Sequence, residues 1–219
     1  MIRAAGRSSK RDDESPEAPI RGALAQVLVR RNDQDPVKQQ MFRGLAEVPV
    51  LSFTAADVAA LEELATSASS ARDLSHVSRT YLTTLAHRLL QSRAHTPSHP
   101  LVGAALTILE RLAGRDGVVQ LGFSTLEVPT ALAPALVDAL LPRLNAGHQR
   151  GQSRGVIMLA QAMGRAGRDQ PKLESALWQV VKNGDAASES QAAALLLAHH
   201  GEPDQVAERL VHASPSLPA

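Results

Sequence analysis

The chain has 219 residues, 23 basic and 22 acidic side chains, a formal net charge of +1 and no cysteine. These numbers exclude disulfides, thiolate nucleophiles, cysteine-bound metals and a globally basic nucleic-acid binder. No apolar stretch reaches the roughly 18 residues of a membrane-spanning helix, and the hydrophobic fraction of 44%, with only 2% aromatic residues, favours helix over sheet.

The first eleven residues have the composition of a short organellar presequence. They contain no acid before Asp12 and carry four basic residues, Arg3, Arg7, Lys10 and Arg11. The alternative is a disordered tail of mixed charge. We expect residues 1–18 to be disordered or ordered only by a partner. We expect the protein to be mitochondrial, with a cytoplasmic location as the alternative.

Helical signals begin at Pro19 and recur along most of the chain. Apolar residues repeat at intervals of three and four, and residues that often cap helices precede several of these stretches. Asp35, Thr54, Asp73 and Ser153 are the expected caps, and Asp57 is expected to point outward. The predicted helices cover residues 20–31, 35–45, 54–64, 73–90, 101–112, 130–144, 153–165, 171–182, 187–200 and 203–212.

Prolines and glycines separate these helices. Pro97 and Pro100 predict a loop over residues 94–100, and Pro142 is expected to end or kink its helix. Residues 118–128 are the only segment that we considered for a strand, with an extended connector as the alternative.

Many short helices without alternating strands predict an all-α domain over residues 19–213, followed by a tail over residues 214–219. The expected architecture is an α-solenoid of stacked antiparallel helix pairs, or an irregular helical bundle. Self-similarity favours the solenoid, because residues 156–167 and 192–201 share an apolar pattern and a glycine stop. A helix that opens with proline follows each of them.

These two runs resemble the organellar helical repeats of the octotricopeptide and heptatricopeptide type, which are related to the repeats of FAST-kinase-like proteins. The first helix of those repeats ends in a Leu-Trp-Ala-x-Ala-x-Leu-Gly-like signature. The residues that fit it are Leu159, Ala160, Ala162 and Gly164 in the first run and Leu196, Leu197, Ala198 and Gly201 in the second. The signature tryptophan is absent at both places, since Trp178 lies in the following helix, and residues 77–112 are a candidate for a degenerate earlier copy. The resemblance implies RNA binding or a place in an organellar RNA–protein assembly.

Motifs that carry chemistry are few. Gly151, Ser153 and Gly155 match the G-x-S-x-G pattern of hydrolases, but a polar loop and not a buried strand precedes the serine. We therefore interpret Ser153 as a helix cap whose hydroxyl accepts a backbone N–H. The adjacent His199 and His200 are interpreted as imidazolium groups at the negative end of a helix dipole. We predict no metal site and no cofactor.

The strongest functional signal is a run of basic residues with one acid, Asp169. Arginine suits phosphate, so the residues are candidates for contact with RNA phosphates, whereas scarce aromatic residues argue against base stacking. The alternative is a solvated basic face. The candidates are Arg143, Arg150, Arg154, Arg165, Arg168 and Lys172.

From these features we expect a non-enzymatic helical-repeat scaffold subunit of a larger assembly. An organellar ribonucleoprotein, such as a mitochondrial ribosome, is the leading candidate, with other protein subunits and RNA as partners. One alternative is a free-standing protein adaptor or RNA-binding factor. The other is an enzyme or effector whose site the sequence does not reveal.

Overall fold

The computed structural model describes residues 17–71, 74–113, 128–199 and 203–213. Within these ranges the chain forms helices and no strand, so the predicted all-α class is confirmed. The ten α-helices of the described residues are α1 (Glu17–Val29), α2 (Asp35–Glu47), α3 (Val58–Ser70), α4 (His76–Ser92), α5 (Pro100–Leu112), α6 (Ala133–His148), α7 (Arg154–Met163), α8 (Pro171–Asn183), α9 (Ala186–His199) and α10 (Pro203–Ala213). The 3₁₀ turns are η1 (Val50–Ser52), η2 (Ala55–Asp57), η4 (Thr130–Leu132) and η5 (Gly164–Gly167).

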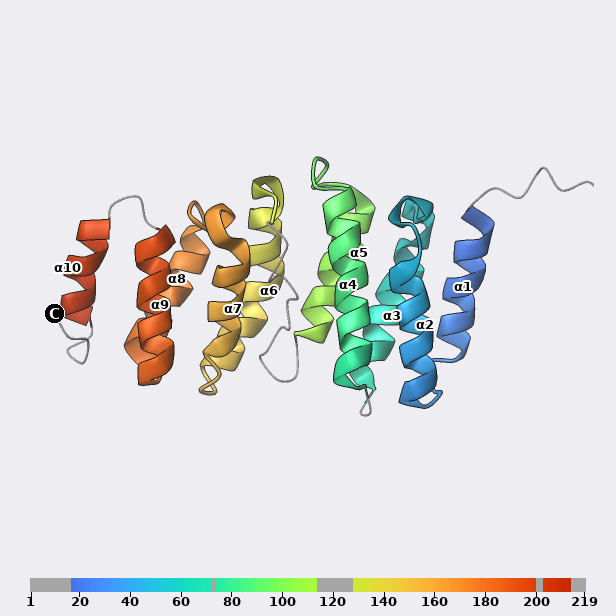
Figure 1. Cartoon of the computed structure of the whole chain (residues 1–219), viewed down its shortest axis with the longest axis horizontal. Coiled ribbons are helices and arrows are strands. Elements are labelled where there is room, and N and C mark those ends of the chain that lie inside the picture. The colour runs from blue at the N-terminus through green and yellow to red at the C-terminus, as the bar shows by residue number, and fades with distance from the viewer. Residues whose placement is uncertain (1–16, 72–73, 114–127, 200–202, 214–219) are drawn as a thin grey trace, which may run out of the picture.

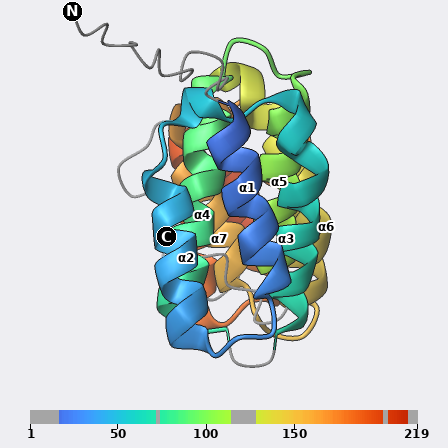
Figure 2. The ribbon, with the colours of Figure 1, turned by 90° about the vertical axis from the view of Figure 1, so that its right-hand side faces the viewer.

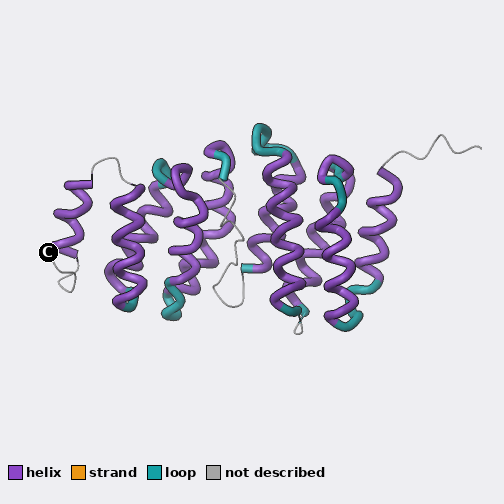
Figure 3. The backbone as a smooth tube through the Cα atoms, viewed as in Figure 1, coloured by secondary structure: helices purple, strands orange, loops and turns teal. Residues whose placement is uncertain are grey.

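The helices stack side by side in an elongated row, with α1 and α10 at opposite ends (Figures 1 and 3). Two layers make up this row (Figure 2). One layer contains α1, α3, α5, α6 and α8, each in contact with the next, and the other contains the pairs α2–α4 and α7–α9. The last helix, α10, packs chiefly on α9.

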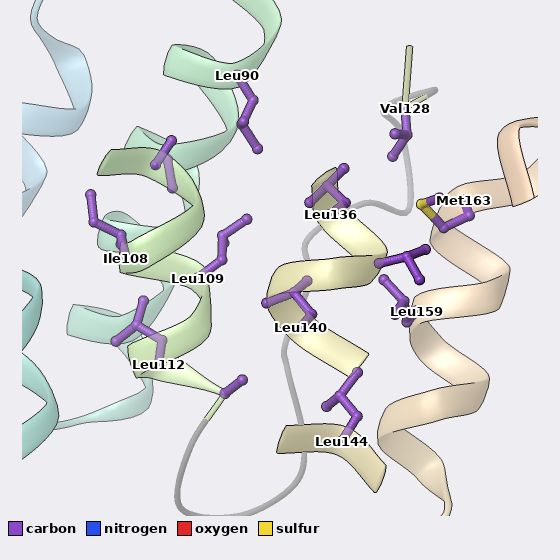
Figure 4. Packing of buried hydrophobic residues seen from close by; sticks show 14 of the residues in the cluster. Leu90, Ile108, Leu109, Leu112, Val128, Leu136, Leu140, Leu144, Leu159 and Met163 are labelled. Atoms are coloured by element: carbon purple, nitrogen blue, oxygen red, sulfur yellow. The ribbon is translucent and has the colours of Figure 1, made fainter. Parts of the chain in front are cut away.

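The stack has one irregular step, between α5 and α6. Other neighbouring helices of the chain alternate between the layers, whereas α5 and α6 lie in the same layer and contact each other directly. They also run in the same direction, since Ile108 to Leu112 and Leu136 to Leu144 both descend in Figure 4. The segment considered for a strand, residues 118–128, lies outside the described residues except for Val128.

A continuous apolar core runs between the two layers. Leucines such as Leu109, Leu140 and Leu159 are fully buried and fill the spaces between helices (Figure 4). Alanines such as Ala104 and Ala160 are also fully buried. Small side chains allow helix axes to approach to about 8 Å. The Ala- and Leu-rich composition therefore serves close helix packing.

Two expectations about individual side chains are wrong. Asp35 is the first residue of α2 and not its cap, and its Oδ1 accepts hydrogen bonds from Ser75 N–H at 3.0 Å and Ser78 Oγ at 2.8 Å. These bonds tie α2 to the start of α4. Asp57 is buried instead of outward, because its Oδ2 accepts hydrogen bonds from the backbone N–H of Thr54 at 2.8 Å and from its hydroxyl at 3.1 Å.

Pro142 does not end its helix, because α6 continues past it to His148. Proline removes one helical hydrogen bond, but Pro142 lies on the exposed side of α6, where water can satisfy the freed carbonyl. The expected cap Thr54 precedes the 3₁₀ turn η2, which leads directly into α3, and it forms a capping box with Asp57. The expected cap Asp73 lies outside the described residues, and Ser75 caps α4.

Candidate functional site

The six basic residues predicted to contact phosphate lie in α6, at both ends of α7 and at the start of α8. Arg150 and Arg154 lie at the start of α7, whereas Arg165, Arg168 and Lys172 follow its end. At about 1.5 Å per residue, the helix separates the two groups by roughly 16 Å along its axis. A single phosphate therefore cannot contact both groups.

Two of the six residues already form ion pairs. Arg143 Nε lies 2.9 Å from Glu110 Oε1 and links α6 to α5. Lys172 Nζ lies 2.5 Å from Asp138 Oδ1 and links α8 to α6. Both pairs link helices that are neighbours in one layer. Half-exposed pairs of this kind contribute at most about 1 kcal/mol each to the free energy of unfolding. The remaining four arginines are exposed.

His199 differs from its interpretation as an imidazolium. Burial first, and then the charge of Arg168, lower the pKa of His199 below its ordinary value. The ring lies against η5, where a Cβ added to Gly167 would be 3.1 Å from its Cε1. The neutral ring is favoured, so packing and not the helix dipole explains this histidine. His200 lies outside the described residues.

Ser153 occupies the expected cap position of α7, but its hydroxyl has another partner. No backbone N–H group of α7 donates a hydrogen bond to its Oγ, which lies 2.8 Å from His148 Nδ1. The side chain is only 3% exposed. The pair joins the end of α6 to the start of α7. A hydroxyl that is buried in this way is closed to a substrate.

A groove of about 620 Å³ lies between α8 and α10. We call it the Trp178 groove, because the only tryptophan of the chain lines it. Charged and polar side chains line it together with the apolar surfaces of Trp178 and Pro171. Its residues are Pro171, Glu174, Ser175, Trp178, Gln179, Lys182, Arg209 and His212.

Trp178, Glu174 and Arg209 form a connected cluster in this groove. The guanidinium carbon of Arg209 lies 4.4 Å from the centroid of the Trp178 ring, a cation–π contact. Trp178 Nε1 donates a hydrogen bond to Glu174 Oε1 at 3.3 Å, and Arg209 Nη1 lies 3.8 Å from the same oxygen. Trp178 is only 7% exposed, so its ring forms the floor of the groove, and the guanidinium of the exposed Arg209 lies over it.

The charge of the Trp178 groove is positive. Among the described lining residues, Lys182 and Arg209 are cations and Glu174 is the one carboxylate. Lys182 lies in the last turn of α8, and His212 lies in the last turn of α10. The two side chains therefore mark the same end of the groove. Sequence reasoning missed this site, and the only signal for it was the single tryptophan at the centre of an amphipathic helix.

The described residues contain no group of three His, Asp or Glu side chains that could hold a metal ion. None of the helices in the described ranges is long and apolar enough to cross a bilayer. In comparisons with known proteins, no protein-family model, no curated protein and no solved structure matches this chain.

Proposed function

We propose that the protein is a non-enzymatic helical-repeat scaffold that holds a partner protein, and that an acidic segment of this partner binds in the Trp178 groove. The observation that carries the proposal is the cluster of Trp178 and Arg209 in a groove of about 620 Å³. Tryptophan and arginine are enriched among residues that dominate protein interfaces. The contact between them already limits the rotamers of both side chains in the free chain, so less side-chain entropy is lost on binding.

The charge and the lining residues of the Trp178 groove favour one kind of occupant. Sites for small molecules are lined mostly by apolar side chains, whereas this groove is bordered by Glu174, Gln179, Lys182 and Arg209. The two cations outnumber the carboxylate, which favours an acidic chain over a basic one. The elongated stack supports the same view, because stacked helices expose long surfaces for macromolecules.

RNA binding through the six basic residues stays a prediction. Their separation into two groups, and the ion pairs of Arg143 and Lys172, make a continuous phosphate track harder to assemble. An organellar ribonucleoprotein is one assembly in which a protein-binding scaffold of this kind can work. The experiment below therefore recovers both protein and RNA.

A photo-crosslinking residue at Gln179, an exposed groove position, tests the proposal in cells that express the protein. The same residue at Gln191, an exposed position on α9 outside the groove lining, is the matched control. We expect a protein adduct at Gln179 that maps to an acidic segment. Its yield should fall in Lys182→Glu and in Arg209→Glu, but not in Arg21→Glu at the far end of the stack.

The fluorescence of Trp178 gives a second measurement, because no other tryptophan contributes to the signal. Adding the purified partner should shift the emission of the wild type, and Lys182→Glu should weaken this titration about tenfold. Adducts that contain only RNA, or protein adducts with unchanged yield in both charge-reversal variants, would overturn the proposal.

A further inference from the structure

The two ends of the stack expose helix faces that no described segment covers. At one end α1 buries Ile20, Leu24 and Val27 against the stack, and at the other end α10 buries Val206 and Leu210. The opposite side of each helix therefore faces away from the rest of the row (Figure 1). These two outer sides are the α1 end face and the α10 end face.

The α1 end face has an apolar centre and basic edges. It consists of Arg21, Gly22, Ala25, Val29 and Arg30, which are all exposed. Gly22, Ala25 and Val29 follow one another at intervals of three and four residues and so lie along one side of the helix. Val29 is 78% exposed. The outer helices of stacked arrays need a polar outer face for solubility, so this apolar centre favours a covering partner.

The α10 end face has the opposite charge. It consists of Asp204, Ala207, Glu208 and Val211, which are all exposed, and Val211 is 59% exposed. Neither carboxylate forms an ion pair with another described residue. Arg209 lies on the side of α10 that borders the Trp178 groove, so it does not neutralise this face. One end of the stack is therefore acidic and the other is basic.

Ion pairs between helices show which charge order suits this stack. Three such pairs join α5 to α6, α6 to α8 and α8 to α10, and in each the carboxylate belongs to the earlier helix and the cation to the later one. The pairs are Glu110–Arg143, Asp138–Lys172 and Glu174–Arg209. A helix with exposed arginines that packs on the acidic α10 end face would continue this order. The α1 end face has that charge.

The directions of the two helices also match. Both α1 and α10 run downward in Figure 1, so a copy placed beyond α10 in the same orientation would pack its α1 parallel to α10. Asp204 and Glu208 lie in the first two turns of α10, and Arg21 lies in the second turn of α1. Val211 and Val29 lie in the last turns. Parallel packing thus brings opposite charges together at one end and two exposed valines together at the other.

We infer that the protein binds a second copy of itself head to tail, with the α10 end face of one copy packed on the α1 end face of the next. The contact is heterologous, because two different faces meet, and each added copy leaves one face of each kind free. The assembly is therefore an open row that lengthens with concentration. The inference does not depend on the acidic partner proposed for the Trp178 groove, which lies on another side of α10.

Sedimentation velocity of the full chain from about 10 μM to about 500 μM tests the inference. We expect species larger than the monomer that increase with concentration. They should decrease as sodium chloride rises from about 50 mM to about 500 mM, because salt screens exposed charges. The double variants Arg21→Glu/Arg30→Glu and Asp204→Lys/Glu208→Lys should each associate at least about tenfold more weakly. An equimolar mixture of the two should associate again, since the reversed charges are complementary.

A pair of glycine variants separates docking from folding. A Cβ added to Gly22 in α1 or to Gly44 in α2 would meet no atom within 4 Å, so both positions have space for a longer side chain. Gly22→Gln places that side chain in the α1 end face and should weaken association at least about tenfold. The matched control Gly44→Gln should associate like the wild type. Circular dichroism checks that both variants stay helical.

Crosslinking identifies the two faces that meet. Val29→Cys and Val211→Cys each introduce a single thiol, because the chain has no cysteine. A short bismaleimide should link a mixture of these variants much more efficiently than either variant alone. The inference is overturned if the wild type stays monomeric throughout the series, if Asp204→Lys/Glu208→Lys or Gly22→Gln associates like the wild type, or if Val29→Cys alone crosslinks as well as the mixture.

Discussion

His87 shows how one buried side chain links the stability of the stack to pH. It lies in α4 with 4% of its surface exposed, and burial lowers its pKa from 6.5 to about 4. The folded state therefore favours the neutral ring. Its contribution to stability is fully present above pH 6.5, the pKa of the unfolded chain, and is lost as the pH falls towards 4.

Replacing this histidine should remove that part of the acid sensitivity. Between pH 7 and pH 4.5 we expect the free energy of unfolding of the wild type to fall by about 2 to 3 kcal/mol more than that of His87→Gln. Urea titrations at the two pH values measure the difference. His95→Gln, at an exposed position, is the control and should behave like the wild type. Parallel losses in the wild type and His87→Gln would contradict the assignment.

Ser153 shows the limit of reading one residue from its neighbours in sequence. Its position before α7 follows from the local pattern, and the structure places it there. Its hydroxyl could bond either to a free N–H of α7 or to His148, and the fold brings the ring to 2.8 Å. The backbone N–H and the imidazole ring compete for this hydroxyl, and only the packing of α6 against α7 decides between them.

At the scale of the elements, the internal repeat is visible in the packing of α7 and α9. Both helices lie in the same layer and run in the same direction (Figure 1). The buried positions Val156, Ile157 and Ala160 of α7 recur at the same spacing in α9 as Ala192, Ala193 and Leu196. Equivalent places in the stack thus bury equivalent positions of the sequence. The family resemblance drawn from this pattern stays a prediction.

Two glycines, one inside a helix and one at a helix end, allow a test of how the helices are packed. Gly103 lies inside α5 with no atom within 4 Å of an added Cβ, whereas a Cβ on Gly184 would lie 2.5 Å from the carbonyl oxygen of Val180. The N–H of Gly184 also donates to that oxygen at 2.7 Å and closes α8. The same substitution should therefore have opposite effects at the two positions.

We expect Gly103→Ala to raise the free energy of unfolding by about 0.5 to 1 kcal/mol, since alanine restricts the unfolded chain and favours helix. Gly184→Ala should lower it by about 1 to 3 kcal/mol, because the end of α8 must shift. Chemical denaturation of both variants beside the wild type measures the two changes. Changes of the same sign would show that the packing around one of the glycines is described wrongly.

On the scale of the whole molecule, a row of helices has ends that are less stable than its middle. Each helix of a stacked array contacts only its neighbours, so stability depends on local interfaces. In the middle, α5 packs against α3, α4 and α6, whereas α10 packs chiefly on α9. Partial opening should therefore begin at the end that carries the Trp178 groove.

Hydrogen exchange measured by mass spectrometry tests this order. Amides of α10 should exchange fastest among the helices, and amides of α5 slowest, because opening α5 exposes buried residues such as Leu101 and Ile108. Addition of the partner protein should slow exchange in α8 and α10 and leave α1 unchanged. Equal protection of α5 and α10 would instead indicate a single cooperative unit.

The sequence by itself determined the helical class, most of the helix positions and the breaks between helices. These features depend on local chemistry: apolar spacing, caps, Pro97, which disfavours helix between α4 and α5, and Pro100, which occupies the first position of α5. It also determined the basic run around α7, although not how that run is divided. The length of α7 separates the basic residues into two groups. The direction of α7 relative to the neighbouring helices is a property of the fold.

Tertiary structure alone decided which distant residues meet. Trp178 meets Arg209 because α8 and α10 border one groove, and Arg79, Arg111 and Arg143 line one pocket because four helices approach at the irregular step between α5 and α6. Periodicity marks the face of a helix that is buried but not the helix that covers it. The Trp178 groove arises from such a pairing, because α8 and α10 are brought side by side only in the folded stack.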